Sequence, residues 1–86
     1  MDTKKLEALA TAVQTGSFTR AAEGLGYTQS GLTHMMNSLE KDIGFPLLVR
    51  SRTGIRLSAA GQRVFPMIQD LLRADEALER EIRLIN

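Results

Sequence analysis

Short polar side chains between residues 28 and 44, in the run TQSGLTHMMNSLEKDIG, are of the types that recognise nucleic acid. Small amides and hydroxyls can donate and accept hydrogen bonds at base edges in a major groove, and a Gln amide can pair with adenine through two bonds at once. In a helix these side chains share one face, because successive residues are about 100° apart. The candidate base-contacting residues are Gln29, Ser30, Thr33, His34 and Asn37.

A second set of candidate contacts is basic. Arg50, Arg52 and Arg56 fall within seven residues that contain no acidic side chain. The 86-residue chain has a net charge of only +1, but residues 1–57 carry seven Lys or Arg against five Asp or Glu. Guanidinium groups pair well with phosphate oxygens, so the cluster predicts contacts with a nucleic-acid backbone. The alternative interpretation is a solvated surface turn.

Other chemistries have little support in the composition. The chain has no Cys and one His, which excludes thiolate ligands and argues against an all-protein zinc site. We find no nucleophile–base pair and no Gly-rich phosphate loop, so we predict no enzymatic activity, no catalytic residue, no metal and no cofactor. No apolar run reaches the length of a membrane span, and the lack of Cys fits a reducing cytoplasm.

The polar face requires a helix, and apolar spacing predicts one over residues 28–44. One apolar side chain recurs every three or four positions, at Leu32, Met36, Leu39 and Ile43. Thr28 can cap the first turn through its hydroxyl oxygen, and Gly44 can end the helix in a left-handed conformation.

Two shorter helices are predicted before it. Thr3 can cap a first helix that ends near residue 15, and Ser17 can cap a second over residues 18–25. A short link that contains glycine, residues 26–27, then leads into the third helix. Two helices joined by such a turn form the helix-turn-helix pattern, although any pair of adjacent helices can resemble it.

A small hairpin is predicted after the third helix. Residues 47–50 and 55–57 have the pattern of short strands, and Gly54 can supply a positive φ at the turn. A hairpin in this position is a wing, and here its tip is basic. We expect Glu40 to have a structural role, in which it pairs with Arg50.

Residues 59–84 predict one long helix capped by Ser58, with a bend at Pro66. At 1.5 Å per residue it would span about 39 Å, more than a compact body can cover. Its apolar residues follow a 4-3-4-3 spacing, which is typical of a helix that packs on another helix. The residues predicted to form a dimer interface are Ile68, Leu71, Leu78 and Ile82.

From about residue 6 to residue 61 the chain resembles the N-terminal domain of LysR-type transcriptional regulators. The resemblance is carried by the run GSFTRAA at residues 16–22 and then by Leu25, Thr28-Gln29, Thr33, Leu39-Glu40, Gly44, Pro46-Leu47, Arg50, Leu57-Ser58 and Ala60-Gly61. It implies that the third helix is the recognition helix, the hairpin a wing that meets the minor groove or phosphates, and the last helix a dimerising linker. It also implies base contacts by Gln29, Ser30, Thr33 and His34.

Four positions depart from the family pattern. Ser30 stands where proline is usual, which adds a hydroxyl and removes an apolar base contact. Thr33 replaces the usual serine, and Leu48 replaces a common phenylalanine. The usual basic residue of the wing is Thr53 here, with Arg52 beside it.

We therefore predict a mainly α chain: a winged helix-turn-helix of three helices and a two-stranded wing over residues 1–58, then a linker and dimerisation helix over residues 59–86. The expected function is sequence-specific binding of double-stranded DNA by a cytoplasmic homodimer at an inverted repeat. Higher assembly would need the C-terminal effector domain of this family, to which nothing here corresponds. The alternative is a winged-helix module that dimerises or binds a protein without DNA; the arginines and the polar face favour DNA.

Overall fold

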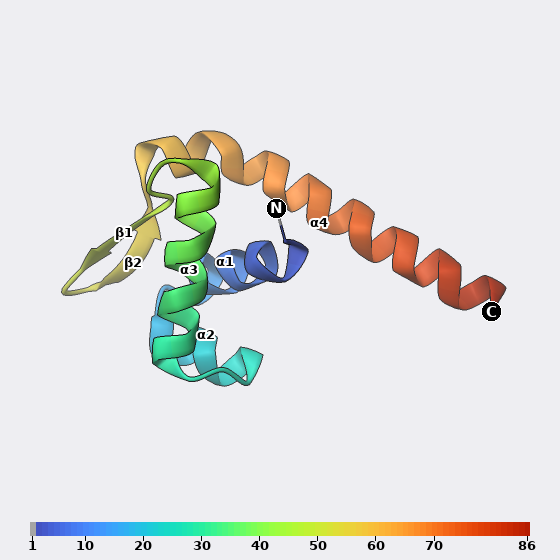
Figure 1. Cartoon of the computed structure of the whole chain (residues 1–86), viewed down its shortest axis with the longest axis horizontal. Coiled ribbons are helices and arrows are strands. Elements are labelled where there is room, and N and C mark those ends of the chain that lie inside the picture. The colour runs from blue at the N-terminus through green and yellow to red at the C-terminus, as the bar shows by residue number, and fades with distance from the viewer. Residues whose placement is uncertain (1) are drawn as a thin grey trace.

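The computed structural model describes residues 2–86, which form four helices and one antiparallel sheet of two strands. In chain order the elements are α1 (Thr3–Thr15), α2 (Phe18–Leu25), α3 (Gln29–Ile43), β1 (Leu48–Ser51), β2 (Gly54–Leu57) and α4 (Ala59–Ile85). Figure 1 shows α1, α2, α3 and the sheet gathered at one end of the molecule, while α4 passes over them and runs outward. The predicted architecture, mainly helical with a small wing and a long last helix, is confirmed.

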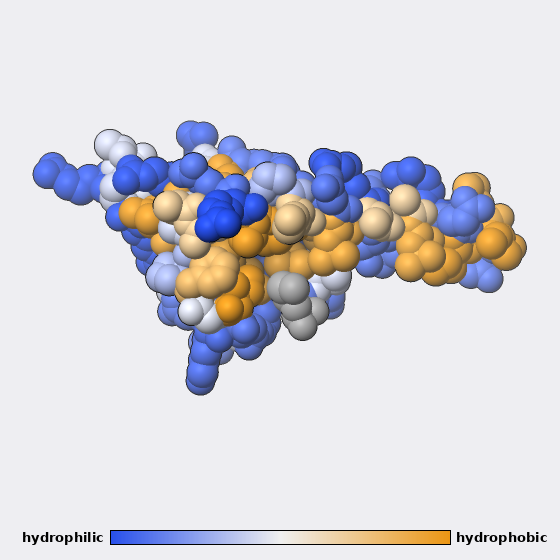
Figure 2. All heavy atoms as spheres, turned by 90° about the horizontal axis from the view of Figure 1, so that it is seen from above, coloured by the Kyte–Doolittle hydropathy of each residue, from blue (hydrophilic) through white to orange (hydrophobic). Residues whose placement is uncertain are grey.

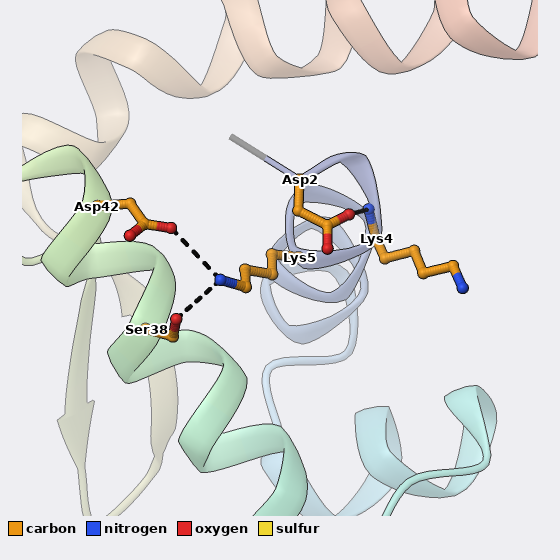
Figure 3. Close-up of polar contacts among 5 residues, drawn as sticks. All are labelled: Asp2, Lys4, Lys5, Ser38 and Asp42. Carbon is orange, nitrogen blue, oxygen red and sulfur yellow. Dashed lines mark hydrogen bonds and ion pairs between the residues drawn. The ribbon is translucent and has the colours of Figure 1, made fainter.

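Local capping signals set most helix boundaries. The hydroxyl oxygens of Ser17, Thr28 and Ser58 accept backbone N–H groups at the starts of α2, α3 and α4, as predicted. The predicted cap at Thr3 is wrong. Asp2 caps α1, because its carboxylate accepts the N–H of Lys4 at 2.9 Å (Figure 3). Thr3 is therefore the first residue inside the helix.

The hydrophobic core lies between the first three helices and the start of α4. Its largest fully buried side chains are Leu6, Leu9, Leu32, Leu39 and Leu47. Small residues on α1 and α2 let the helices approach closely, namely Ala8, Ala12, Ala21 and Ala22. At the rim of this core Lys5 of α1 donates to Ser38 at 2.8 Å and pairs with Asp42 at 3.3 Å, which ties α1 to α3 (Figure 3).

The hairpin is confirmed, but β1 starts one residue later than predicted and β2 one residue earlier. Leu48 pairs with Leu57, and the strands run to Ser51 and from Gly54, so Arg52 and Thr53 form the turn. Gly54 has the predicted positive φ, 136°, and a Cβ there would lie 2.5 Å from the carbonyl oxygen of Gly16. The hairpin therefore packs directly against the turn between α1 and α2.

The α4 helix is packed at one end only. A Cβ at Gly61 would overlap the carbonyl oxygen of Leu47, so the absence of a side chain there lets α4 start against the hairpin. Phe65 is also buried, and the helix continues through Pro66 as one ribbon (Figure 1). The bend expected at this proline stays a prediction. Beyond the first turns α4 leaves the body, and residues 76–86 are all exposed.

Candidate nucleic-acid interface

The first turns of α3 present the predicted polar residues to solvent. Gln29, Ser30, His34 and Asn37 are exposed, and Thr33 is half-buried. The opposite side of the helix buries Leu32, Met36 and Leu39. We refer to Gln29, Ser30, Thr33, His34 and Asn37 as the polar face of α3.

No acidic residue lies between positions 28 and 39, so an approaching anion meets no negative side chain along these turns. The helix starts at Thr28, whose Oγ1 accepts the N–H of Gly31 at 3.0 Å. The positive end of the helix dipole lies at this same start, which further favours an anion there. The polar face therefore combines hydrogen-bonding groups with a local electrostatic field that favours the binding of an anion.

Arg50 links the wing to the polar face. Its guanidinium carbon lies 4.1 Å from the centre of the Phe18 ring, and its Nη2 donates to the Thr33 hydroxyl at 3.4 Å. Since Thr33 accepts from Arg50, its own O–H remains available to donate to a base or a phosphate. The structure thus brings Arg50 and Thr33, 17 residues apart, into one group.

The expected pairing of Glu40 with Arg50 is wrong. A carboxylate oxygen of Glu40 accepts the backbone N–H groups of Leu47 and Leu48, at 2.6 and 3.0 Å. These two donors belong to the segment that leads into β1. Glu40 is therefore structural, as expected, but it anchors the base of the wing and leaves Arg50 free to contact Phe18 and Thr33.

The three arginines of the wing do not form one cluster. Arg50 lies opposite Ile55 in the ladder, whereas Arg56 lies opposite Val49. Cross-strand partners share a face and neighbours along a strand alternate, so Arg50 and Arg56 occupy opposite faces of the hairpin. Arg52 lies in the turn at the tip, and all three side chains are exposed. Of the three, Arg50 contacts the helices, through Phe18 and Thr33.

An open groove of about 480 Å³, with a lining of mixed polar and apolar character, separates the wing from the helices. Its walls come from the turn between α1 and α2, the start of α3 and the hairpin, and they include Ser17, Thr19, Gln29, Arg50 and Arg52. The N–H of Ile55 donates to the carbonyl oxygen of Gly16 at 3.1 Å and fixes the hairpin at the floor of this groove.

One contact of the polar face was missed by sequence reasoning. The Nε2 of Gln29 donates to the Oγ1 of Thr19 at 2.9 Å, which joins α3 to α2. Thr19 belongs to the GSFTRAA run, but nothing in the sequence indicates that residues 19 and 29 meet. Their contact depends on the angle at which the two helices pack.

A separate apolar surface lies on α4. Leu71, Leu78 and Ile82 are 45%, 60% and 48% exposed, whereas Ile68 is 7% exposed and belongs to the core. Within one chain Ile68 is therefore mostly covered by the body, because α4 is still packed on it at that turn, and its contact with a second chain stays a prediction. We refer to residues 71–85 as outer α4, and Figure 2 shows an apolar band along it to its free end.

The apolar band continues onto the body. A groove of about 300 Å³ lies between the end of α3 and α4, and its lining is almost wholly apolar. It is lined by Ile43, Phe45, Val64, Met67, Ile68 and Leu71. The apolar surface of α4 is thus longer than the outer part alone.

Sequence comparison decides the family. Residues 3–62 match the model of the bacterial regulatory helix-turn-helix proteins of the lysR family, which is more than half of the chain. The chain belongs to the LysR family. The match covers the three helices, the hairpin and the first turn of α4, so it contains the whole of the polar face and all three wing arginines.

A curated bacterial regulator is similar to nearly the whole chain. The HTH-type transcriptional regulator HdfR of Escherichia coli O139:H28 is 37% identical over 82 residues, which are 95% of this chain and 29% of that protein. The chain therefore spans less than a third of the length of this relative.

Two solved LysR structures have the same fold. The structure of CbnR, a LysR family transcriptional regulator, superimposes with a TM-score of 0.89 at 30% identity and covers 96% of this chain and 29% of that one. The CbnR_DBD–DNA complex superimposes with a TM-score of 0.85 at 30% identity and covers all of both chains. The winged-helix fold of this LysR chain, with α4 included, is thus shared with a domain solved in complex with DNA.

The part of the chain that the structure describes holds neither a candidate metal site nor a helix that could span a membrane. Residues 2–86 contain no group of three or more His, Asp or Glu placed to hold a metal ion. Over the same residues no helix is both long and apolar enough to cross a membrane.

Proposed function

We propose that this chain binds double-stranded DNA sequence-specifically, as the DNA-binding part of a bacterial cytoplasmic transcriptional regulator. The polar face of α3 enters a major groove, where its amides and hydroxyls meet base edges. Arg52, at the tip of the wing, and Arg56 meet the flanking backbone or the minor groove. The observation that carries the proposal is the polar face itself, exposed, free of acids and held at its start by Thr28.

Two copies are proposed to bind together through outer α4. Leu71, Leu78 and Ile82 are 45%, 60% and 48% exposed, and burying them against a second helix removes them from water. A two-fold pair places two recognition helices in symmetric positions, so the site on DNA is an inverted repeat. In this proposal residues 1–58 read DNA and residues 59–86 set the distance between the two copies.

A salt titration on duplexes of random sequence tests DNA binding as a class. A protein that neutralises several phosphates shows log affinity falling linearly with log salt concentration, because counterions are released. We expect a clear negative slope of log affinity against log salt concentration. Replacing Arg52 by Ala should reduce the magnitude of this slope by about one. The competing function is a module that dimerises or binds a protein without DNA. It predicts no measurable binding at low salt, and that result would overturn the proposal.

A further inference from the structure

Thr19 and Gln29 form a side-chain bridge between the two helices of the helix-turn-helix. Thr19 is the second residue of α2, and Gln29 is the first residue of α3. The amide Nε2 of Gln29 lies 2.9 Å from the Thr19 Oγ1 and donates to it. Both side chains are exposed at the groove between wing and helices, so the bridge lies on the surface that DNA would meet.

The bridge uses only one of the hydrogen-bonding positions of Gln29. An amide nitrogen carries two hydrogens, and its carbonyl oxygen accepts. Pairing with adenine requires the oxygen and one of those hydrogens. The other hydrogen is free for Thr19, so the bridge and the adenine pair can exist together. An exposed Gln otherwise rotates about three bonds, and ordering it on binding is costly in entropy.

We propose that Thr19 is a positioning residue that determines the base specificity of Gln29. It fixes the plane of the amide before DNA arrives, so that Gln29 presents one donor and one acceptor in a set direction. Thr19 itself reads no base. This inference rests on the proposed function and adds a residue of α2 to the recognition machinery of α3.

The test uses a duplex that the wild-type chain enriches from a random-sequence library, together with its variants changed one base pair at a time. Thr19→Val keeps the side-chain shape and a similar helix propensity but removes the hydroxyl. We expect roughly a two- to tenfold loss of affinity on the enriched duplex, the value of one hydrogen bond. The loss should be confined to the base pair at which Gln29→Ala also loses discrimination. Thr19→Ser should bind like the wild type, because it keeps the oxygen.

A matched control separates the bridge from a general effect of replacing a helical threonine. Thr11 on α1 donates its hydroxyl to the carbonyl oxygen of Glu7 within its own helix and has no bond to α3. Thr11→Val should leave affinity and base preference unchanged, and thermal melting of each variant checks that it folds.

The double variant Thr19→Val with Gln29→Ala gives the decisive comparison. If Thr19 acts through Gln29, the second substitution adds nothing to Gln29→Ala. If Thr19 instead binds a phosphate, Thr19→Val weakens every duplex by the same factor and does so in both backgrounds, which would overturn the inference. Unchanged base preference in Thr19→Val would overturn it too. Failure of the wild type to enrich any duplex is a different result, which removes the proposed function and this inference with it.

Discussion

The polar face of α3 and outer α4 are both exposed, yet they differ in chemistry and in restraint. On α3 the exposed groups are hydrogen-bonding, and Gln29 and Thr33 are already held by Thr19 and Arg50. Outer α4 also exposes charged side chains, but its exposed groups include Leu78 and Ile82, which the body does not cover. The difference indicates two kinds of partner. A restrained polar face suits the fixed pattern of base edges, whereas an uncovered apolar band suits another protein surface.

The largest effect should come from disrupting outer α4. We expect the double variant Leu78→Asp with Ile82→Asp to be a folded monomer that binds its enriched duplex at least about a hundredfold more weakly, because two linked half-sites bind far more tightly than one. Sedimentation at micromolar concentration measures the oligomeric state. Leu84→Asp is the control, since Leu84 is 74% exposed on the same helix but off the 4-3-4-3 seam. A double variant that sediments as a dimer would place the interface elsewhere.

The next largest effect should come from the polar face. Gln29→Ala should cost about 1–3 kcal/mol on the enriched duplex and much less on random DNA. The loss should fall at one base pair in each half-site. Alanine is the better helix former, so unfolding cannot explain a loss. Affinity for duplexes varied one base pair at a time is the measurement; an equal loss at every position would mean that Gln29 only anchors the backbone.

These two surfaces were not equally predictable from the sequence. The starts and ends of α2 and α3 follow from local signals, a Ser or Thr cap and a glycine stop, so their bounds match the prediction. The exposure of Leu78 follows from the length of α4. Ile68 belongs to the same 4-3-4-3 pattern of apolar residues on α4 as Leu78, but it is buried. Where burial ends along this pattern depends on how far the folded body extends beside α4.

Long-range polar partners were the least predictable feature. Glu40 has an obvious ionic partner in Arg50, yet it caps two backbone N–H groups whose position depends on how the chain leaves α3. Thr19 and Gln29 meet because of the packing angle of α2 on α3. Strand pairing places Arg56 on the face of the wing opposite to Arg50. The closeness of the three arginines in the sequence does not reveal this separation.

A smaller effect, on stability, should follow from loosening the base of the wing. Glu40→Gln keeps an acceptor oxygen but loses the charge that strengthens the bonds to Leu47 and Leu48. We expect the free energy of unfolding to fall by about 1–2 kcal/mol. Urea unfolding at fixed protein concentration measures this, and Glu79→Gln on exposed α4 is the matched control. Equal stability of the two variants would show that the Glu40 bonds contribute no net stability.

The smallest effect should come from the tip of the wing. Arg52→Ala should weaken binding a fewfold, and by similar factors on enriched and unrelated duplexes, if the guanidinium meets phosphates. A larger loss on sites flanked by A-tracts would place Arg52 in a narrow minor groove. Competition binding on the two kinds of duplex distinguishes these outcomes, and an unchanged affinity on both would remove Arg52 from the interface.

The most direct test of the account is the sequence of the duplexes that the wild-type chain enriches from a random library. If α3 reads bases while outer α4 joins two copies, the enriched duplexes share an inverted repeat with one fixed spacing between half-sites. The double variant of Leu78 and Ile82 should lose that spacing. Enrichment of a single half-site by the wild type would contradict the dimer, and enrichment of no sequence at all would contradict base reading by α3.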